Sequence, residues 1–217
     1  MFPIGDDNTQ ERTVPVVTYA LIALNVLFFL VELSGGDTFI DHWAFVPARF
    51  SAHPEVNAVT IFSSMFMHGS WLHLGGNMLF LWIFGDNVED QFGHAKFVIF
   101  YLLAGMAATF AQYFVSPEST IPNVGASGAI AGVLGAYILM FPQSRVNVLV
   151  GQQMVALPAF IVLGLWIALQ FVPAVGSVAA TDQSTGGVAY MAHVGGFVSG
   201  ILMTFLFRPA RAPGTAA

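Results

Sequence analysis

Long runs of apolar residues, separated by short polar segments, dominate the amino-acid sequence. The separating segments are rich in Gly, Pro, Asp and Ser, which tend to end regular structure. A helix needs about 20 apolar residues to cross a bilayer core about 30 Å thick. Six runs approach this length, so the pattern predicts an all-α, polytopic membrane protein with six transmembrane helices. The runs lie at residues 14–33, 69–85, 96–115, 126–141, 147–172 and 188–207.

The expected domain organisation is a single six-helix bundle over residues 14–207. A short tail at residues 1–13 precedes it, and a short tail at residues 208–217 follows it. The first tail is polar and acidic and lacks the basic start and small-residue cleavage site of a signal peptide, so we expect it to be retained. The second tail, RPARAPGTAA, is typical of a disordered chain end.

The composition shows that water is not the main solvent of this chain. Hydrophobic residues make up 56% of it and charged residues 8%, against about 25% charged residues in soluble domains. The lipid bilayer is therefore the expected surrounding. The lack of Cys excludes disulfides and thiol nucleophiles, and the net charge of -6 disfavours a nucleic-acid partner.

The few basic residues predict the orientation in the membrane, because cytoplasmic loops retain Lys and Arg. With the N-terminus inside, Arg49 alone among the 6 bases falls outside. Six spans then put both termini in the cytoplasm, and in a bacterium the membrane would be the plasma (inner) membrane. The bases expected on the cytoplasmic side are Arg12, Lys96, Arg145, Arg208 and Arg211.

No charged residue falls in the interior of a predicted span, which disfavours a transporter or an ion pump. The polar residues at membrane depth are neutral. Asn and Gln at this depth most often form hydrogen bonds between helices, whereas a Ser together with two His needs a chemical explanation. The residues for which we expect the structural role are Asn25, Gln112 and Gln170.

Ser127 lies in VGASGAIAGVLGAY, at the start of the fourth predicted helix. The first turn of a helix offers unpaired N–H groups and the positive end of the helix dipole, which suits a developing oxyanion. The Gly-x-Ser-Gly motif alone is weak, and its alternative interpretation is an N-cap followed by a packing stripe. The stripe comprises Gly128, Gly132 and Gly135.

His193 lies in AYMAHVGGFVSGILMTF, on the sixth predicted helix, and shares a small-residue face with Gly196 and Gly200. Such faces allow close packing of helices. Contact with the glycine stripe of the fourth helix would bring the imidazole to the Ser127 hydroxyl, and a Ser paired with a His base is an activated nucleophile. For His193 taken alone, the alternative interpretation is a histidine that only hydrogen-bonds a carbonyl.

The second predicted helix contributes His73 and Asn77, which share one face at i,i+4 spacing. Both side chains donate hydrogen bonds without bringing a permanent charge into the bilayer, so they suit oxyanion binding. His68 lies about 140° away, nearer the outer interface. Its spacing to His73 is poor for zinc and no carboxylate completes a ligand set, so we expect no metal and no cofactor. In the predicted orientation His73, Asn77, Ser127 and His193 all fall in the outer half of the membrane.

Four motifs occur in order along the chain. HGSWLHLGGN, GASGA and AHVGGFVSG lie on the second, fourth and sixth predicted helices, and GDNVEDQFGHAKFVIFY lies between the second and third. Together they resemble the signatures of the rhomboid intramembrane serine proteases, whose G-x3-E-x3-G-x3-F pattern the last motif follows. The resemblance covers nearly the whole chain. It implies a rhomboid-like six-helix bundle and serine endopeptidase activity on transmembrane-protein substrates.

The resemblance also implies roles for individual residues. Ser127 would attack the scissile carbonyl, and His193 would accept the proton and later return it, as a Ser-His dyad. The backbone N–H of Ser127, with His73 and Asn77, would hold the oxyanion. His68 matches the outer histidine of the motif and is expected to fix loop structure or water. The motif glycines expected to support the site are Gly125, Gly128, Gly196 and Gly200.

One position departs from the family pattern. Many relatives carry an aromatic residue one turn after the serine, where it stacks on the imidazole, but this chain has Ala131. We therefore expect another group to hold His193, with Tyr190 and Met191 as candidates. The first outer loop also lacks the Trp-Arg pair of some members.

A nucleophile below the outer surface must receive its substrate sideways, from the lipid. We expect loop 173–187 and the fifth helix around Trp166 to open as a gate. The alternative function is a catalytically inactive rhomboid-like factor that binds membrane proteins, and a small-molecule transporter is a further one. The presence of both Ser127 and His193 favours the enzyme.

Overall fold

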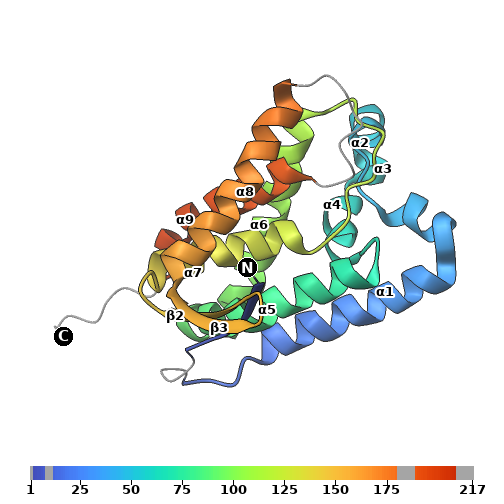
Figure 1. Ribbon diagram of the computed structural model, residues 1–217. Coiled ribbons are helices and arrows are strands. Elements are labelled where there is room, and N and C mark those ends of the chain that lie inside the picture. Colours follow the sequence, from blue (N-terminus) through green and yellow to red (C-terminus); the bar gives the residue numbers. More distant parts are fainter. Residues whose placement is uncertain (1, 8–11, 180–188, 209–217) are drawn as a thin grey trace.

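Six long helices form the body of the protein in the computed structural model, which describes residues 2–7, 12–179 and 189–208 (Figure 1). They are α1 (Val16–Trp43), α5 (Trp71–Phe92), α6 (His94–Val115), α7 (Ser127–Met140), α8 (Ala159–Ala179) and α9 (Tyr190–Phe207). The short helices between α1 and α5 are α2 (Pro47–Ala52), α3 (Pro54–Asn57), α4 (Thr60–Ser63) and the 3₁₀ helix η1 (Ser64–Phe66). The strands are β1 (Phe2–Asp6), β2 (Arg145–Val150) and β3 (Gln153–Pro158).

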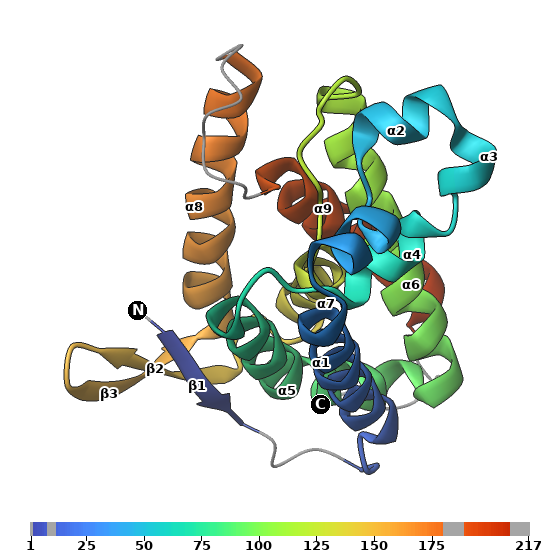
Figure 2. The same ribbon diagram turned by 90° about the vertical axis from the view of Figure 1, so that its right-hand side faces the viewer.

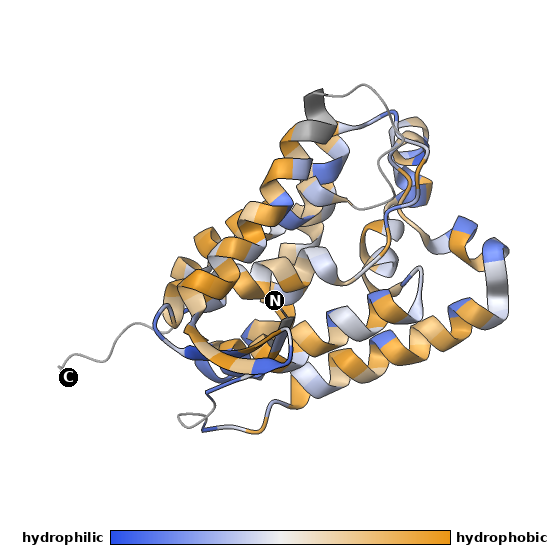
Figure 3. Cartoon of the chain, in the orientation of Figure 1, coloured by the Kyte–Doolittle hydropathy of each residue, from blue (hydrophilic) through white to orange (hydrophobic). Residues whose placement is uncertain are grey.

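Three of the described helices, α1, α6 and α9, are long and apolar enough to cross a membrane. Helix α1 runs beyond its predicted end and breaks at Gly36, whose φ is 58°. Large apolar side chains such as Leu27, Leu202 and Phe205 are exposed on these helices. Figure 3 shows that hydrophobic residues predominate along the long helices and that many of the hydrophilic residues lie in the connecting segments. The mostly helical, apolar architecture agrees with a membrane protein.

A three-stranded antiparallel sheet, in the order β1-β2-β3, corrects the strictly all-α prediction. Strand β1 lies in the predicted N-terminal tail, and a turn at Gly151 joins β2 to β3. The fifth helix, predicted from residue 147, begins only at Ala159. Val146 and Val148 are buried in β2 and alternate with less buried neighbours, which is the period of a strand. The continuous apolar run conceals that period, because β-branched residues suit both a strand and a buried helix.

Helix α8 also ends later than predicted. The segment from residue 173, predicted as the start of a loop, is helical as far as Ala179, with Pro173 inside the helix. Proline in a helix interior removes one backbone hydrogen bond, a loss that membrane helices tolerate, and α8 continues past it. The rest of the predicted gate loop, residues 180–187, lies outside the described residues.

Helix α7 lies at the centre of the bundle (Figure 2) and is buried from Gly128 to Tyr137. Its glycines pack against those of α9. A Cβ added to Gly196 or Gly200 would come closer than 3.0 Å to the carbonyl oxygen of Gly128 or Gly132, respectively. Only glycine allows two helix backbones to approach this closely. The predicted contact between the fourth and sixth long helices is therefore confirmed.

The carboxylate of Glu89, near the end of α5, ties that helix to the start of α1. Its Oε1 accepts the Val17 N–H at 2.9 Å, and its Oε2 accepts both the N–H and the hydroxyl of Thr18 at 2.7 Å. The His94 Nδ1 lies 2.6 Å from Oε1. First-turn N–H groups have no partner within their own helix, so this buried carboxylate caps α1 from outside. The glutamate is the acidic position of the G-x3-E-x3-G motif.

Candidate active site

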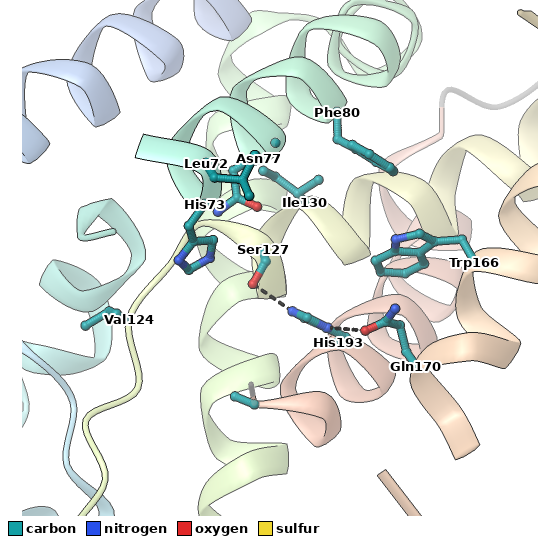
Figure 4. Close-up of a pocket in the computed structure, with 12 residues that line it drawn as sticks. Leu72, His73, Asn77, Phe80, Val124, Ser127, Ile130, Trp166, Gln170 and His193 are labelled. Atoms are coloured by element: carbon teal, nitrogen blue, oxygen red, sulfur yellow. Dashed lines mark hydrogen bonds between the residues drawn. The ribbon is translucent and has the colours of Figure 1, made fainter. Parts of the chain in front are cut away.

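Ser127 and His193 form a hydrogen-bonded pair inside the bundle. Ser127 is the first residue of α7, and His193 lies in the first turn of α9. The imidazole Nε2 lies 2.8 Å from the Ser127 Oγ (Figure 4). His193 is one helical turn from Gly196, so the glycine packing of α7 on α9 determines this distance. A hydroxyl hydrogen-bonded to an imidazole nitrogen has the geometry of an activated nucleophile.

The chain enters α7 through a turn that requires glycine. Gly125 has a φ of 131°, which side chains rarely adopt, and its N–H donates to the Ser64 carbonyl at 2.9 Å. A Cβ at this position would lie 2.9 Å from two ring atoms of His73. Glycine at position 125 therefore allows the turn before Ser127 and leaves room for the His73 ring beside it.

A cavity of about 380 Å³ joins the Ser-His pair to the predicted oxyanion donors. Ser127 and His193 line it together with His73 and Asn77. The Asn77 amide nitrogen is buried and has no hydrogen-bond partner among the described residues. A free donor beside a serine at a helix N-terminus is available to a developing oxyanion. The structure thus brings together all four residues that the sequence singled out for chemistry.

The family of the chain follows from a comparison with known protein families, in which residues 56–210 match the Rhomboid domain. The chain belongs to the rhomboid family. It is 36% identical over 133 residues to Rhomboid protease GluP of Bacillus subtilis, which covers 60% of the chain and 26% of that protein. It is 29% identical over 192 residues to Rhomboid protein 1, mitochondrial, of Saccharomyces cerevisiae, covering 86% of the chain and 51% of that protein.

A human relative extends the comparison. The chain is 32% identical over 143 residues to the human Presenilin-associated rhomboid-like protein, mitochondrial, which covers 64% of the chain and 35% of that protein. The chain thus spans about half, or less, of the length of these relatives. The family resemblance inferred from the sequence motifs is confirmed.

Gln170, on α8, also belongs to this site, although the sequence analysis expected only a structural role for it. Its Oε1 lies 2.8 Å from the Nδ1 of His193, so the imidazole is held between Gln170 and Ser127 (Figure 4). Trp166, one turn earlier on α8, lies against the imidazole with 5.9 Å between ring centroids. The expected interhelical hydrogen bond of Gln170 is therefore present, and its partner is the candidate base.

The group that holds the imidazole differs from the two candidates taken from the sequence. Tyr190 lies edge-on to the His193 ring, at 6.5 Å between centroids, and the polar contact to Nδ1 comes from Gln170 rather than from Tyr190 or Met191. The i,i+4 spacing of Trp166 and Gln170 was the available signal, because it puts an aromatic and an amide side chain on one face of α8. What the spacing could not show is that this face meets α9.

His68 is buried behind His73, with ring centroids 5.1 Å apart. Neither of its ring nitrogens has a hydrogen-bond partner within the described part of the chain. Its backbone N–H donates to the Glu32 carboxylate at 2.9 Å, which joins the segment before α5 to α1. Its expected role in fixing this loop stays a prediction. Over residues 2–7, 12–179 and 189–208, no three His, Asp or Glu side chains converge as ligands for a metal ion.

Proposed function

We propose that this rhomboid is an intramembrane serine endopeptidase that cleaves transmembrane segments of other membrane proteins. The observation that carries the proposal is the 2.8 Å contact between the Ser127 Oγ and the His193 Nε2 inside an apolar bundle. A serine hydroxyl is a weak nucleophile until a neighbouring base accepts its proton. Among the described residues that line the cavity, none carries a permanent charge, so the pair works with groups that are neutral at rest and inexpensive to bury.

In the proposed reaction, the Ser127 Oγ attacks the scissile carbonyl carbon while its proton passes to the His193 Nε2. The C–N bond of the tetrahedral intermediate then breaks, and the imidazolium gives the proton to the leaving amine. In the second half of the reaction, Nε2 accepts a proton from water, whose oxygen attacks the acyl carbon. The acyl–Oγ bond breaks and the proton returns to Ser127.

The proposed oxyanion site is formed by three donors that meet at one end of the cavity. The Ser127 N–H is at the positive end of the α7 dipole, and the Asn77 amide and His73 ring approach from α5. The unpartnered Asn77 nitrogen supports this role, because it breaks no existing hydrogen bond within the described residues when it binds the oxyanion. Each such donor contributes about 2.7 to 4 kcal/mol of barrier lowering in serine proteases.

We place substrate entry between α5 and α8. Phe80 of α5 and Trp166 of α8 both line the cavity, and their rings lie 6.3 Å apart between centroids. Exposed apolar residues of α8, such as Leu169 and Val172, face outward, as lipid contact requires. A transmembrane helix that enters here must unwind, because helical carbonyls are hydrogen-bonded. Gly, Ser or Pro near its outer end lowers that cost.

The proposed topology has six spans, both termini in the cytoplasm and the Ser-His pair in the outer half of the bilayer. Length and composition identify α1, α6 and α9 as spans. Helices α5, α7 and α8 would be the other three. The sheet would then lie at the cytoplasmic side, where Arg145 begins β2 and Lys96 lies in the first turn of α6. The positive-inside rule favours this arrangement.

A fluorophosphonate probe tests the nucleophile in purified protein. The wild type should be labelled covalently, Ser127→Ala should not be labelled, and Ser199→Ala should be labelled like the wild type. Ser199 is a matched control because it is also a helical serine, and its hydroxyl donates to the Gly196 carbonyl at 2.9 Å. Absence of labelling in the wild type, or equal labelling of Ser127→Ala, would favour the inactive membrane-protein-binding factor instead.

A further inference from the structure

We propose that Gln170 is a positioning residue that fixes the tautomer and the ring orientation of His193. The inference rests on the proposed function, since it concerns how the base of the Ser127–His193 pair is held. The Gln170 Oε1 lies 2.8 Å from Nδ1, and the Ser127 Oγ lies 2.8 Å from Nε2. Both ring nitrogens are therefore engaged, one by α8 and the other by α7.

The two contacts determine which nitrogen carries the single proton of a neutral imidazole. An amide oxygen accepts hydrogen bonds and cannot donate them, so with Oε1 turned toward the ring the nitrogen facing Gln170 is Nδ1–H. Nε2 is then unprotonated and accepts the Ser127 hydroxyl, as a general base must. The opposite tautomer would require the Gln170 amide to turn over and present its NH2 to Nδ1, and it would direct an N–H at the serine. Gln170 thus favours the tautomer in which His193 can act as a base.

The orientation of the ring also depends on α8. Trp166 packs against the imidazole at 5.9 Å between centroids, while Ala131 of α7 offers no aromatic surface to it. Soluble serine proteases orient the histidine with a carboxylate, but a carboxylate at this depth would bring a charge into the bilayer. An amide provides the same acceptor atom without that charge.

Three variants separate a positioning role from a purely structural one. Gln170→Leu removes the acceptor and keeps a side chain of similar bulk, and Gln170→Glu restores an oxygen at similar reach. Leu202→Ala is the matched control, because Leu202 lies on α9, is 63% exposed and is not among the residues that line the cavity. The assay is cleavage of a single-span substrate in lipid vesicles, with kcat and KM determined separately and thermal unfolding measured in parallel.

We expect Gln170→Leu to lower kcat by about 10- to 100-fold, the loss seen when the second hydrogen-bond partner of a metal-binding histidine is removed, while KM and the unfolding temperature stay unchanged. Gln170→Glu should recover part of kcat, because it restores an acceptor oxygen but adds a charge at this depth, and Leu202→Ala should match the wild type. The proposal is overturned if Gln170→Leu keeps the wild-type kcat or if its only effect is on KM, whereas recovery of activity in Gln170→Glu supports it.

A second measurement does not require turnover. Nitrogen-15 NMR of protein labelled at histidine reports which ring nitrogen carries the proton, with His193 assigned from its missing signal in His193→Ala. The wild type should show His193 protonated at Nδ1, and Gln170→Leu should shift it toward the Nε2–H tautomer. An unchanged tautomer in Gln170→Leu would refute the role of Gln170. A wild type that neither cleaves nor reacts with a fluorophosphonate would instead refute the proposed function, while the NMR result would still decide on Gln170.

Discussion

Substituting Gly196 by Ala tests whether close packing of α9 on α7 determines the geometry of the Ser-His pair. The added Cβ would lie closer than 3.0 Å to the Gly128 carbonyl oxygen, 3.1 Å from its carbonyl carbon and 3.3 Å from the Ala131 Cβ. Two of these atoms belong to helix backbone and the third is a rigid methyl group, so no flexible side chain can move aside. The overlap can be relieved only by separating the two helices.

The size of the effect follows from the distances. Moving α9 outward by about 1 Å relieves the overlap but lengthens the contact between Ser127 and His193 from 2.8 Å to about 3.8 Å, beyond hydrogen-bonding range. Misplacement of a catalytic group by this amount costs about 10²-fold in rate, which corresponds to about 2.7 kcal/mol of barrier. Overpacking should also reduce the free energy of unfolding by about 1 to 3 kcal/mol.

The assay compares Gly196→Ala with Gly164→Ala in vesicle cleavage and in thermal unfolding. A Cβ at Gly164 of α8 meets no atom within 4 Å, so this control adds the same methyl group without overlap and should keep full activity. We expect kcat to fall about 100-fold in Gly196→Ala alone. Wild-type kcat together with a wild-type unfolding temperature in Gly196→Ala would show that α9 does not need this close approach, and would refute the reasoning.

Three further predictions concern other parts of the fold. Asn77→Ala should lower kcat by about 10²- to 10³-fold with little change in KM, because it removes a proposed oxyanion donor. Steady-state kinetics measures both constants, and an unchanged kcat would exclude that role. Glu89→Ala should reduce the free energy of unfolding by about 2 kcal/mol, the upper end of the effect of losing an N-cap. Unfolding in mixed detergent measures this change, and equal stability of the variant and the wild type would mean that the α1 cap is dispensable. Burial raises the pKa of Asp6 to about 7, opposed by the hydrogen bond from Tyr137 and assisted by Asp86. Folding therefore favours protonated Asp6, and its stabilisation is complete below pH 3.8 and is lost as the pH rises through about 7. Asp6→Asn should flatten this decline in unfolding scans at several pH values, and an unchanged decline would contradict the assignment.

The long helices were predictable because each lies in an apolar run close to the length of a membrane span. The strands were not. Strand β1 is a short segment that contains Pro and Gly, and its pairing partner β2 lies about 140 residues further along the chain, so the contact is non-local. Strands β2 and β3 were hidden for a different reason: their apolar residues are continuous with those of α8, so hydropathy alone merges a hairpin with the helix that follows.

The site was predictable where local sequence determines it. Ser127 at a helix start, His193 beside a glycine face, and His73 with Asn77 at i,i+4 spacing all follow from helical periodicity. The contact between Gln170 and His193 was not predictable, because it depends on the rotation of α8 against α9. Such a rotation is decided by the summed packing of two helices, which no single stretch of sequence encodes.

The central claim is that Ser127 hydrolyses peptide bonds within membrane-embedded substrates. The most direct measurement is the cleavage of a panel of single-span proteins in lipid vesicles, with every cut site determined by mass spectrometry for the wild type and for Ser127→Ala. We predict that the wild type cuts in or next to the outer half of the transmembrane segment and that Ser127→Ala does not cut at all. Cuts that persist in Ser127→Ala, or cuts confined to soluble regions far from the membrane, would contradict the account.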